Sequence, residues 1–345
     1  MSVQSQFLKF NKNIQLDYNL NSELKEKRDI LVNILKGSDD LPAFKIINQG
    51  SYGMHLGVEP LDKEYDIDVG LRFNVNKADY SPMDFKNIIY DLLKNHTDYG
   101  AKIKNPCVTI TYKKEGEKAY HIDLVSYVYE DKNSQNSQIY LARGKQSDED
   151  SIQWERSDPV GLVKYINEII ERGNSREQAR RVVRYIKRWK NKNFSNIRNA
   201  EPASIGITLI VFENFTYYEC NDLEALLNSL NEINRYFYYS GTSFYGRELY
   251  KIEYTLPFDL NFEYGKNIFE KMTDKQMTDF KEKLNKFYDD LVSVKEEYDE
   301  LEKYKKLNKI FGDDFEIPNV ENVAKKQTNF IPHTSASGKE NFVDR

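Results

Sequence analysis

Apolar and polar residues alternate most clearly in the first half of the chain, and this pattern predicts β-strands. Residues 65–73 (YDIDVGLRF) and 119–129 (AYHIDLVSYVY) are rich in β-branched and aromatic residues, as strands are. The stretch AFKIINQG and residues 106–113 are further strand candidates. Apolar residues repeat at helical spacing in 22–36 and 81–96, and the second of these opens with a Ser-Pro helix start. We therefore expect a mixed core of strands and helices.

From Pro159 onward the pattern becomes helical, and the expected helices are 159–172, 175–192, 202–217, 221–236 and 273–306. The polar stretch 131–157 is expected to be mainly loop. The chain should therefore comprise a core with an N-terminal helix (1–158), a helical lobe (159–312) and a flexible tail (313–345). This predicts a bilobed α+β protein with its ligand cleft between the lobes.

Composition narrows the protein class. The 345 residues carry a net charge of −5, so binding to any polyanion must come from a local patch. No apolar run is long enough for a membrane span, and the first residues lack the apolar segment of a signal peptide. Cys107 and Cys220 have no metal-type spacing, which indicates a reduced cytoplasmic setting without structural zinc.

Two aspartates in the first predicted strand suggest a metal site. Asp66 and Asp68 are two residues apart, so in a strand they share one face. Asp123, the only acid in the second strand, could complete a set of three carboxylates for two Mg²⁺ ions. The Gly50-Ser51 pair just upstream can offer backbone N–H groups and a hydroxyl to a phosphate. Together these residues predict a site for a nucleoside triphosphate held on metal.

Each of these features also has a purely structural interpretation. A lone D-x-D is usually a turn or a solvated strand edge, but strong strand formers surround this one. Ser51 could be the N-cap of a helix over 52–57, a role compatible with phosphate binding.

Residues 175–192 form the most basic predicted helix. Ala179, Val182, Ile186 and Trp189 should pack inward, and a basic stripe adjoins them: Arg176, Arg180, Arg184 and Lys187. Such a stripe is usually a solvated face. Across a cleft from a metal site, however, a lysine reaching the phosphates is chemically expected, and we select Lys187. Ser204, at the start of the helix SIGITLIVFENF, could bind the same phosphates or act as an N-cap.

These motifs, in the order QGSYGMHLGVEP, YDIDV, HIDLV, RVVRYIKRWK and EPASIGITLIVFEN, resemble the CD-NTase family of bacterial anti-phage defence. These are cGAS/DncV-like nucleotidyltransferases, similar also to oligoadenylate synthases. The resemblance implies a polymerase-β-like nucleotidyltransferase core with an oligoadenylate-synthase-like C-terminal helical lobe. It also implies an enzyme that joins nucleoside triphosphates (NTPs), ATP among them, into a cyclic di- or trinucleotide second messenger and releases pyrophosphate.

The resemblance also implies roles for individual residues and partners. Gln49, Gly50 and Ser51 would bind nucleotide, with Lys187 and Ser204 clamping the phosphates. Asp66, Asp68 and Asp123 would be the catalytic residues and the ligands of Mg²⁺ or Mn²⁺, and Asp123 would help to deprotonate the attacking ribose hydroxyl through its metal. No Cys/His cluster matches the zinc insertion of animal cGAS, so an obligatory DNA activator is not expected. A separate effector would read the cyclic product, and accessory proteins of the defence system would act on the C-terminus at Arg345.

Other interpretations stay open. A nucleotidyltransferase of the same superfamily could modify a separate acceptor, such as an antibiotic, a protein or a tRNA. A catalytically dead scaffold is a third hypothesis, which the three intact carboxylates disfavour. Base selection is not readable from the sequence. Four residues are candidates by position and type only: Asn174, Tyr217, Tyr218 and Tyr245.

Overall fold

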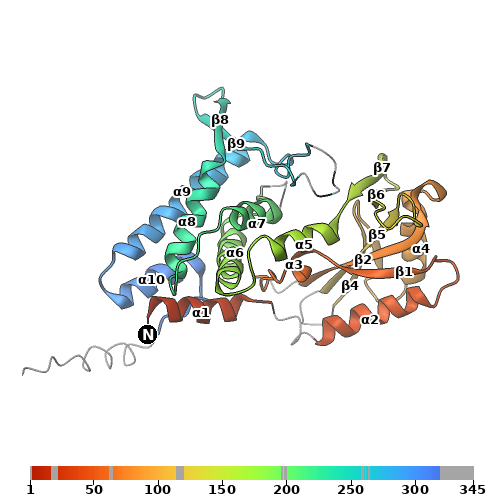
Figure 1. Ribbon diagram of the computed structural model, residues 1–345, viewed down its shortest axis with the longest axis horizontal. Coiled ribbons are helices and arrows are strands. Elements are labelled where there is room, and N and C mark those ends of the chain that lie inside the picture. Colours follow the sequence, from red (N-terminus) through yellow and green to blue (C-terminus); the bar gives the residue numbers. More distant parts are fainter. Residues whose placement is uncertain are drawn as a thin grey trace, which may run out of the picture.

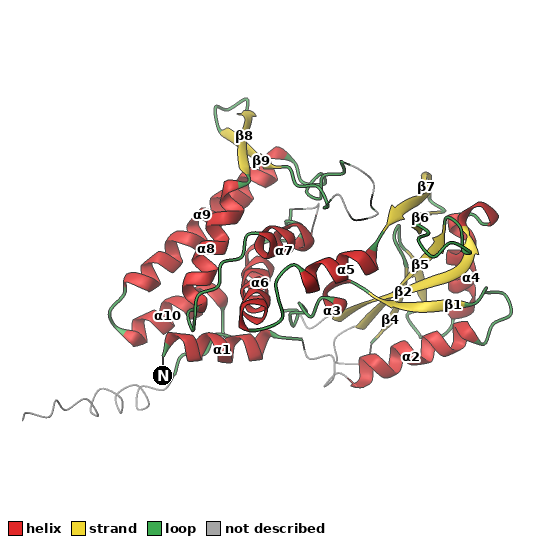
Figure 2. Ribbon diagram, in the orientation of Figure 1, coloured by secondary structure: helices red, strands yellow, loops and turns green. Residues whose placement is uncertain are grey.

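A computed structural model describes residues 2–16, 22–61, 65–113, 120–195, 197, 200–257, 260, 262 and 265–318. Figure 1 shows a sheet with its helices at one end of the molecule and a group of helices at the other. We call these the sheet region (described residues from 22 to 157) and the helical region (described residues from 2 to 16 and from 174 to 318), with the helix of residues 159–168 between them. Figure 2 shows the same division by secondary structure.

The sheet region is built on seven strands. Their bounds are β1 Phe44–Asn48, β2 Tyr65–Asn76, β3 Ala101–Ile103, β4 Val108–Tyr112, β5 Tyr120–Tyr129, β6 Ile139–Lys145 and β7 Asp148–Ser157. The order is β1-β2-β5-β4-β3, and β6 pairs with both β5 and β7. Strands β2 and β5 are parallel, whereas the other pairs are antiparallel. The helical elements of this region are α2 Ser22–Lys36, α3 Gly50–Gly53, η1 Lys77–Asp79 and α4 Pro82–Leu93.

Strand alternation decides which face of the sheet is core and which faces the cleft. On β2, Val69, Leu71 and Phe73 are buried in one hydrophobic cluster with residues of α2 and α4, and Phe73 stacks on Phe85 at 4.4 Å. On β5, Ile122 and Leu124 belong to the same cluster. Because side chains alternate along a strand, the intervening residues of β2 and β5 face the opposite side of the sheet.

The helical region contains the larger hydrophobic cluster. Its helices, together with α5, are α1 Val3–Ile14, α5 Pro159–Glu168, α6 Asn174–Asn193, α7 Ser204–Glu213, α8 Asp222–Arg235, α9 Asp274–Glu296 and α10 Glu300–Phe311. Phe7 and Phe10 of α1 pack against Tyr185 of α6 and Phe311 of α10. Helix α7 is apolar on all sides and is buried from Gly206 to Phe212, as expected for a central helix.

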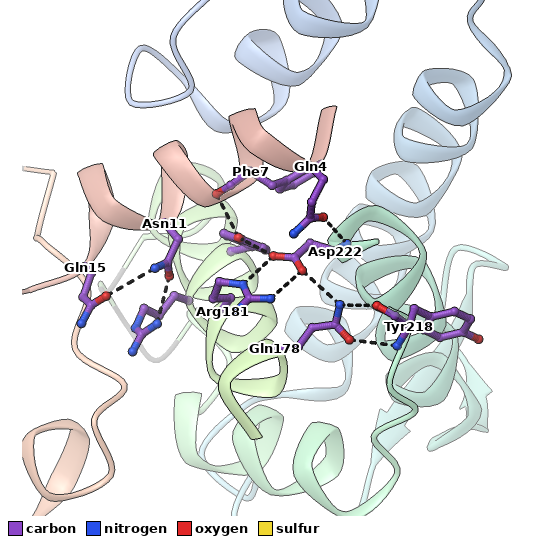
Figure 3. Close-up of polar contacts among 10 residues, drawn as sticks. Gln4, Phe7, Asn11, Gln15, Gln178, Arg181, Tyr218 and Asp222 are labelled. Atoms are coloured by element: carbon purple, nitrogen blue, oxygen red, sulfur yellow. Dashed lines mark hydrogen bonds and ion pairs between the residues drawn. The ribbon is translucent and has the colours of Figure 1, made fainter. Parts of the chain in front are cut away.

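A buried polar network ties α1 to α6 and α8 (Figure 3). The fully buried carboxylate of Asp222 accepts hydrogen bonds from Arg181 (2.7 and 2.8 Å), Tyr185 (2.8 Å) and Gln178 (3.1 Å). Tyr185 shares its hydroxyl between Asp222 and the carbonyl of Phe7. Burial alone would raise the pKa of Asp222, but these donors outweigh it and hold the pKa below its usual value. A carboxylate buried in this way is stabilised only while its donors remain in place.

The mixed α+β composition is as predicted, but three elements differ. Residues 131–157 were expected to be loop, yet they form the antiparallel β6–β7 hairpin. The second half was expected to be all helix, yet it contains a hairpin of β8 Phe237–Thr242 and β9 Glu248–Ile252. The helix predicted over 273–306 is two helices, because Asp299 caps a new helix by accepting from the N–H groups of Leu301 and Glu302.

The N-terminus also differs from expectation. Residues 3–14 form α1, which the sequence analysis did not predict and which packs in the helical region. The helix predicted over 22–36 is α2 and lies on the sheet. From residue 319 on, the predicted tail 313–345 falls outside the described residues. No helix in the described part of the chain has the length and apolar character needed to cross a membrane.

Candidate active site

A cleft of about 540 Å³ lies between the sheet and helices α6 and α7. Its walls include every site residue predicted from the sequence except Asp66: Gln49, Gly50, Ser51, Asp68, Asp123, Lys187 and Ser204. Position 66 lies on β2 beside His121 of β5, but the side chain of Asp66 is outside the described residues. Segments from both halves of the sequence therefore meet at one concavity large enough for a nucleotide.

Two carboxylates are brought together by strand register. Asp68 and Asp123 are direct partners on the parallel strands β2 and β5, so their side chains are neighbours on the cleft face. Asp123 accepts a hydrogen bond from Thr109 of β4, and the ammonium nitrogen of Lys104 lies 3.7 Å from the same carboxylate. These contacts fix the orientation of Asp123.

The Gly-Ser segment lies directly against the carboxylates. Gly50 has a left-handed backbone with φ of 60°, and a Cβ atom added to it would lie 3.0 Å from Oδ2 of Asp68. Ser51 lies inside α3, whose N-cap is Gln49, so the predicted N-cap role of Ser51 is wrong. The buried side chain of Gln49 accepts a hydrogen bond from Tyr127 at 2.8 Å. The absence of a side chain at Gly50 thus lets the turn approach Asp68 closely.

Lys187 extends from α6 to the cleft. Its ammonium group donates a 3.0 Å hydrogen bond to the carbonyl of Leu56, in the segment that follows α3. Burial, with the charges of Lys190 and Arg184, lowers the pKa of Lys187 to about 7. An anion arriving in the cleft would favour the charged form of this lysine.

Lys190 is a cleft-side residue that the sequence analysis missed. It is buried, and its ammonium group contacts the hydroxyl of Ser204 at 2.5 Å, the carbonyl of Pro202 at 3.2 Å and the carboxylate of Glu201 at 2.5 Å. The N-cap of α7 is Ala203, so the alternative N-cap role of Ser204 is wrong. The pairing of Lys190 with Ser204 could have been suspected only from knowing how α6 and α7 pack.

Two arginines of α6, Arg184 and Arg188, make structural contacts in this arrangement instead of facing solvent. Arg184 is buried and donates to Asn11 of α1 (2.9 Å) and to the carbonyl of His55 (2.7 Å). Arg188 is also buried and lies 3.2 Å from Asp314. Helix α6 therefore holds the segment after α3 in place. Gln15, just after α1, pairs with Val58 of the same segment and helps to hold it.

Two further features of the cleft were not anticipated. Cys107 lines it beside Asp123, and burial, with the charge of Asp123, raises the pKa of its thiol to about 12. Without a cation nearby, a thiol with so high a pKa stays protonated. Among the described residues that line the cleft, none of the four base-contact candidates occurs, and Tyr245 is 92% exposed on the β8–β9 turn.

Comparison with known proteins relates this geometry to one family. Residues 44–127 match the family model described as cyclic GMP-AMP synthase DncV-like, nucleotidyltransferase domain. A cyclic GMP-AMP synthase from Escherichia albertii is 27% identical over 208 residues, which is 54% of this chain and 43% of that protein. The chain thus aligns with less than half the length of this curated relative.

Two solved structures have the same fold. The Bradyrhizobium diazoefficiens CD-NTase CdnG in complex with GTP superposes with a TM-score of 0.65 at 13% identity, over 90% of this chain and 95% of that one. Vibrio cholerae DncV with the linear intermediate 5′-pppA(3′,5′)pG superposes with a TM-score of 0.55 at 20% identity, over 81% and 70%. The sheet and its cleft are thus those of a nucleotidyltransferase fold, and residues 44–127 of this fold are similar to the DncV-like nucleotidyltransferase domain.

Proposed function

We propose that this protein is a cyclic oligonucleotide synthase: it joins NTPs, releases pyrophosphate and closes the product into a cyclic di- or trinucleotide. The observation that carries the proposal is the convergence on one cleft of Asp68, Asp123, the Gly50-Ser51 turn, Lys187 and Ser204. Carboxylates on one wall and phosphate-binding groups on the others are the parts that nucleotidyl transfer requires.

The donor triphosphate would lie between the turn and α6. The turn at Gly50-Ser51 would hold its phosphates from the sheet side. Lys187, and Ser204 supported by Lys190, would hold them from the helical side. Because Lys187 has a pKa of about 7 in the free protein, phosphate contact would draw a proton onto it and strengthen the attraction.

The donor set fits a hard divalent cation. Asp68 and Asp123 are adjacent carboxylates on one face, and carboxylate oxygens are the donors that Mg²⁺ prefers. Asp68 and Asp123, with Asp66 as the expected third ligand, would hold Mg²⁺ or Mn²⁺. Metal ions in such a site neutralise the charge that develops on the reacting phosphate. Asp123, held by Thr109 and Lys104, would keep its carboxylate in a fixed position toward the attacking ribose hydroxyl.

From the resemblance to the CD-NTase family we also propose a role in cytoplasmic anti-phage signalling, in which a separate effector reads the cyclic product. We further propose that ATP is among the substrates, that no DNA activator is needed, and that accessory proteins act on the C-terminus. Plating efficiency of phage on cells carrying Asp68→Ala against wild-type protein tests the defence role.

Pyrophosphate release tests the reaction class. Purified protein with Mg²⁺ and all four NTPs, with no other acceptor, should release pyrophosphate, and Asp68→Asn and Asp123→Asn should each abolish release. Release that required an added antibiotic, protein or tRNA would support the acceptor-modifying alternative instead. Release that survived both substitutions would contradict the assignment of the site.

A further inference from the structure

A second concave site lies in the helical region, between the C-terminal end of α6 and helices α9 and α10. Its volume is about 360 Å³. Figure 1 shows α9 and α10 at the end of the molecule opposite the sheet. The pocket is separate from the cleft, and it has no part in the proposed reaction.

The charge of this pocket is one-sided. Among the described residues that line it, Asp290 is the single acid, and five are lysines: Lys192, Lys283, Lys286, Lys306 and Lys309. Asp290 pairs with Lys286 at 2.9 Å, and Lys306 pairs with Glu297 at 2.9 Å. The whole chain is negative, so this concentration of positive charge is local.

Three of the five ammonium groups have no carboxylate partner in the described part of the chain. Lys192 donates to the carbonyl of Lys309 (2.7 Å), and Lys283 donates to the carbonyl of Asn193 (2.5 Å). Neutral carbonyls orient these groups without cancelling their charge. The ammonium group of Lys309 makes no hydrogen bond or ion pair within the described residues.

The base of the pocket is rigid and partly aromatic. Trp189 of α6 stacks on Phe287 of α9 with ring centroids 4.6 Å apart and an interplanar angle of 9°. Both rings are almost fully buried, so they anchor the helices that carry the lysines rather than offering a platform for a base.

We propose that this pocket binds a small anion carrying two or more phosphate groups. Several ammonium groups around one concavity suit an anion with several charges. No arginine is among the described lining residues, so recognition is by point charges, which suits phosphate better than the paired geometry of a carboxylate. The volume suits a small molecule rather than a polymer.

The position of the pocket on α6 gives it a connection to the cleft. Lys187 lines the cleft and Lys190 contacts the cleft residue Ser204, while Trp189 and Lys192 line the second pocket, so one helix contributes residues to both sites. Binding at the pocket does not depend on the proposed reaction and is measured without catalysis.

Trp189 provides the measurement. The chain has two tryptophans, and the other is Trp154 of β7 in the sheet region. In a Trp154→Phe protein, the emission of Trp189 should change saturably on titration with inorganic tripolyphosphate in EDTA. Isothermal titration calorimetry on Lys187→Gln protein, whose cleft lacks a phosphate-binding lysine, should give the same affinity without that substitution.

Matched variants decide the location. The double variant Lys283→Gln/Lys309→Gln should bind about tenfold more weakly or worse, because charge-assisted hydrogen bonds are lost. The control Lys295→Gln/Lys305→Gln removes the same charge from α9 and α10 outside the pocket and should bind as wild type does, as should Lys187→Gln. No saturable binding, equal weakening by both double variants, or loss only with Lys187→Gln would overturn the proposal. Displacement of the probe by a ten-nucleotide single-stranded DNA at equal phosphate concentration would indicate a nucleic-acid surface instead.

Discussion

Gly50→Ala is the substitution for which the structure gives the sharpest prediction. Gly50 has φ of 60°, and any residue with a Cβ atom in the left-handed region costs roughly 1–2 kcal/mol. The added methyl group would lie 3.0 Å from Oδ2 of Asp68, which is closer than ordinary van der Waals contact. Either the turn or the carboxylate must therefore move by a few tenths of an ångström.

Gly246→Ala is the matched control. Gly246 also has a positive φ, 82°, but a Cβ atom there would meet nothing within 4 Å. Both substitutions should therefore lower the free energy of unfolding by a similar roughly 1–2 kcal/mol, measured by urea denaturation. Only Gly50→Ala should also reduce kcat for pyrophosphate release, by about tenfold to a hundredfold, because small displacements of reacting groups are costly.

Two results would refute this reasoning. If Gly50→Ala retained kcat within about twofold of Gly246→Ala, the close approach of the turn to Asp68 would not matter for the reaction. If Gly246→Ala lost activity to the same degree, left-handed strain alone would account for the effect, and the contact with Asp68 would be irrelevant.

Three further predictions concern groups whose partners the structure identifies. Asp222→Ala should lower the free energy of unfolding by about 3–5 kcal/mol, because it leaves Arg181 without its carboxylate partner. Folding lowers the pKa of Asp222, so the stability that its carboxylate contributes is present above the unfolded pKa of about 3.9. This contribution is lost as the pH falls through the folded pKa. The free energies of unfolding of wild type and Asp222→Ala, measured by chemical denaturation, should therefore converge at low pH. Because the pKa of Lys187 is about 7, NTP binding at pH 8 should be accompanied by the uptake of close to one proton. Calorimetry in two buffers of different ionisation enthalpy measures this uptake. The same uptake in Lys187→Met protein would contradict the prediction. Ser204→Ala should raise KM for NTP about tenfold. It should change the free energy of unfolding by less than the roughly 1 kcal/mol expected for loss of an N-cap. An unchanged KM together with a loss of stability of that size would instead support the capping role of Ser204.

The sequence was most informative where one residue type has one strong physical requirement. The D-x-D strand and the Asp123 strand were predicted because β-branched and aromatic residues surround the acids. Their direct register, Asp68 beside Asp123, followed only from the parallel pairing of β2 and β5. Which strands pair depends on the tertiary structure, and the alternation of apolar and polar residues along each strand does not determine it.

The sequence was least informative where polarity misled. The β6–β7 hairpin reads as loop because, among the described strands, β7 pairs only with β6, and its edge position tolerates polar residues. Arg184 and Arg188 read as surface residues because arginine is rarely buried, yet contacts from other helices and loops satisfy part of their hydrogen bonding. Lys190 was missed because helical periodicity cannot tell which lysine of α6 meets Ser204.

The most direct test of the central claim is the chemical form of the product. Purified protein incubated with the four NTPs and Mg²⁺ should yield a compound that resists phosphatase and has, by mass spectrometry, the mass of a cyclic di- or trinucleotide. Asp66→Ala/Asp68→Ala protein should yield none. A product whose terminal phosphates are all removed by phosphatase, or one found only on an added acceptor, would contradict the assignment as a cyclic oligonucleotide synthase.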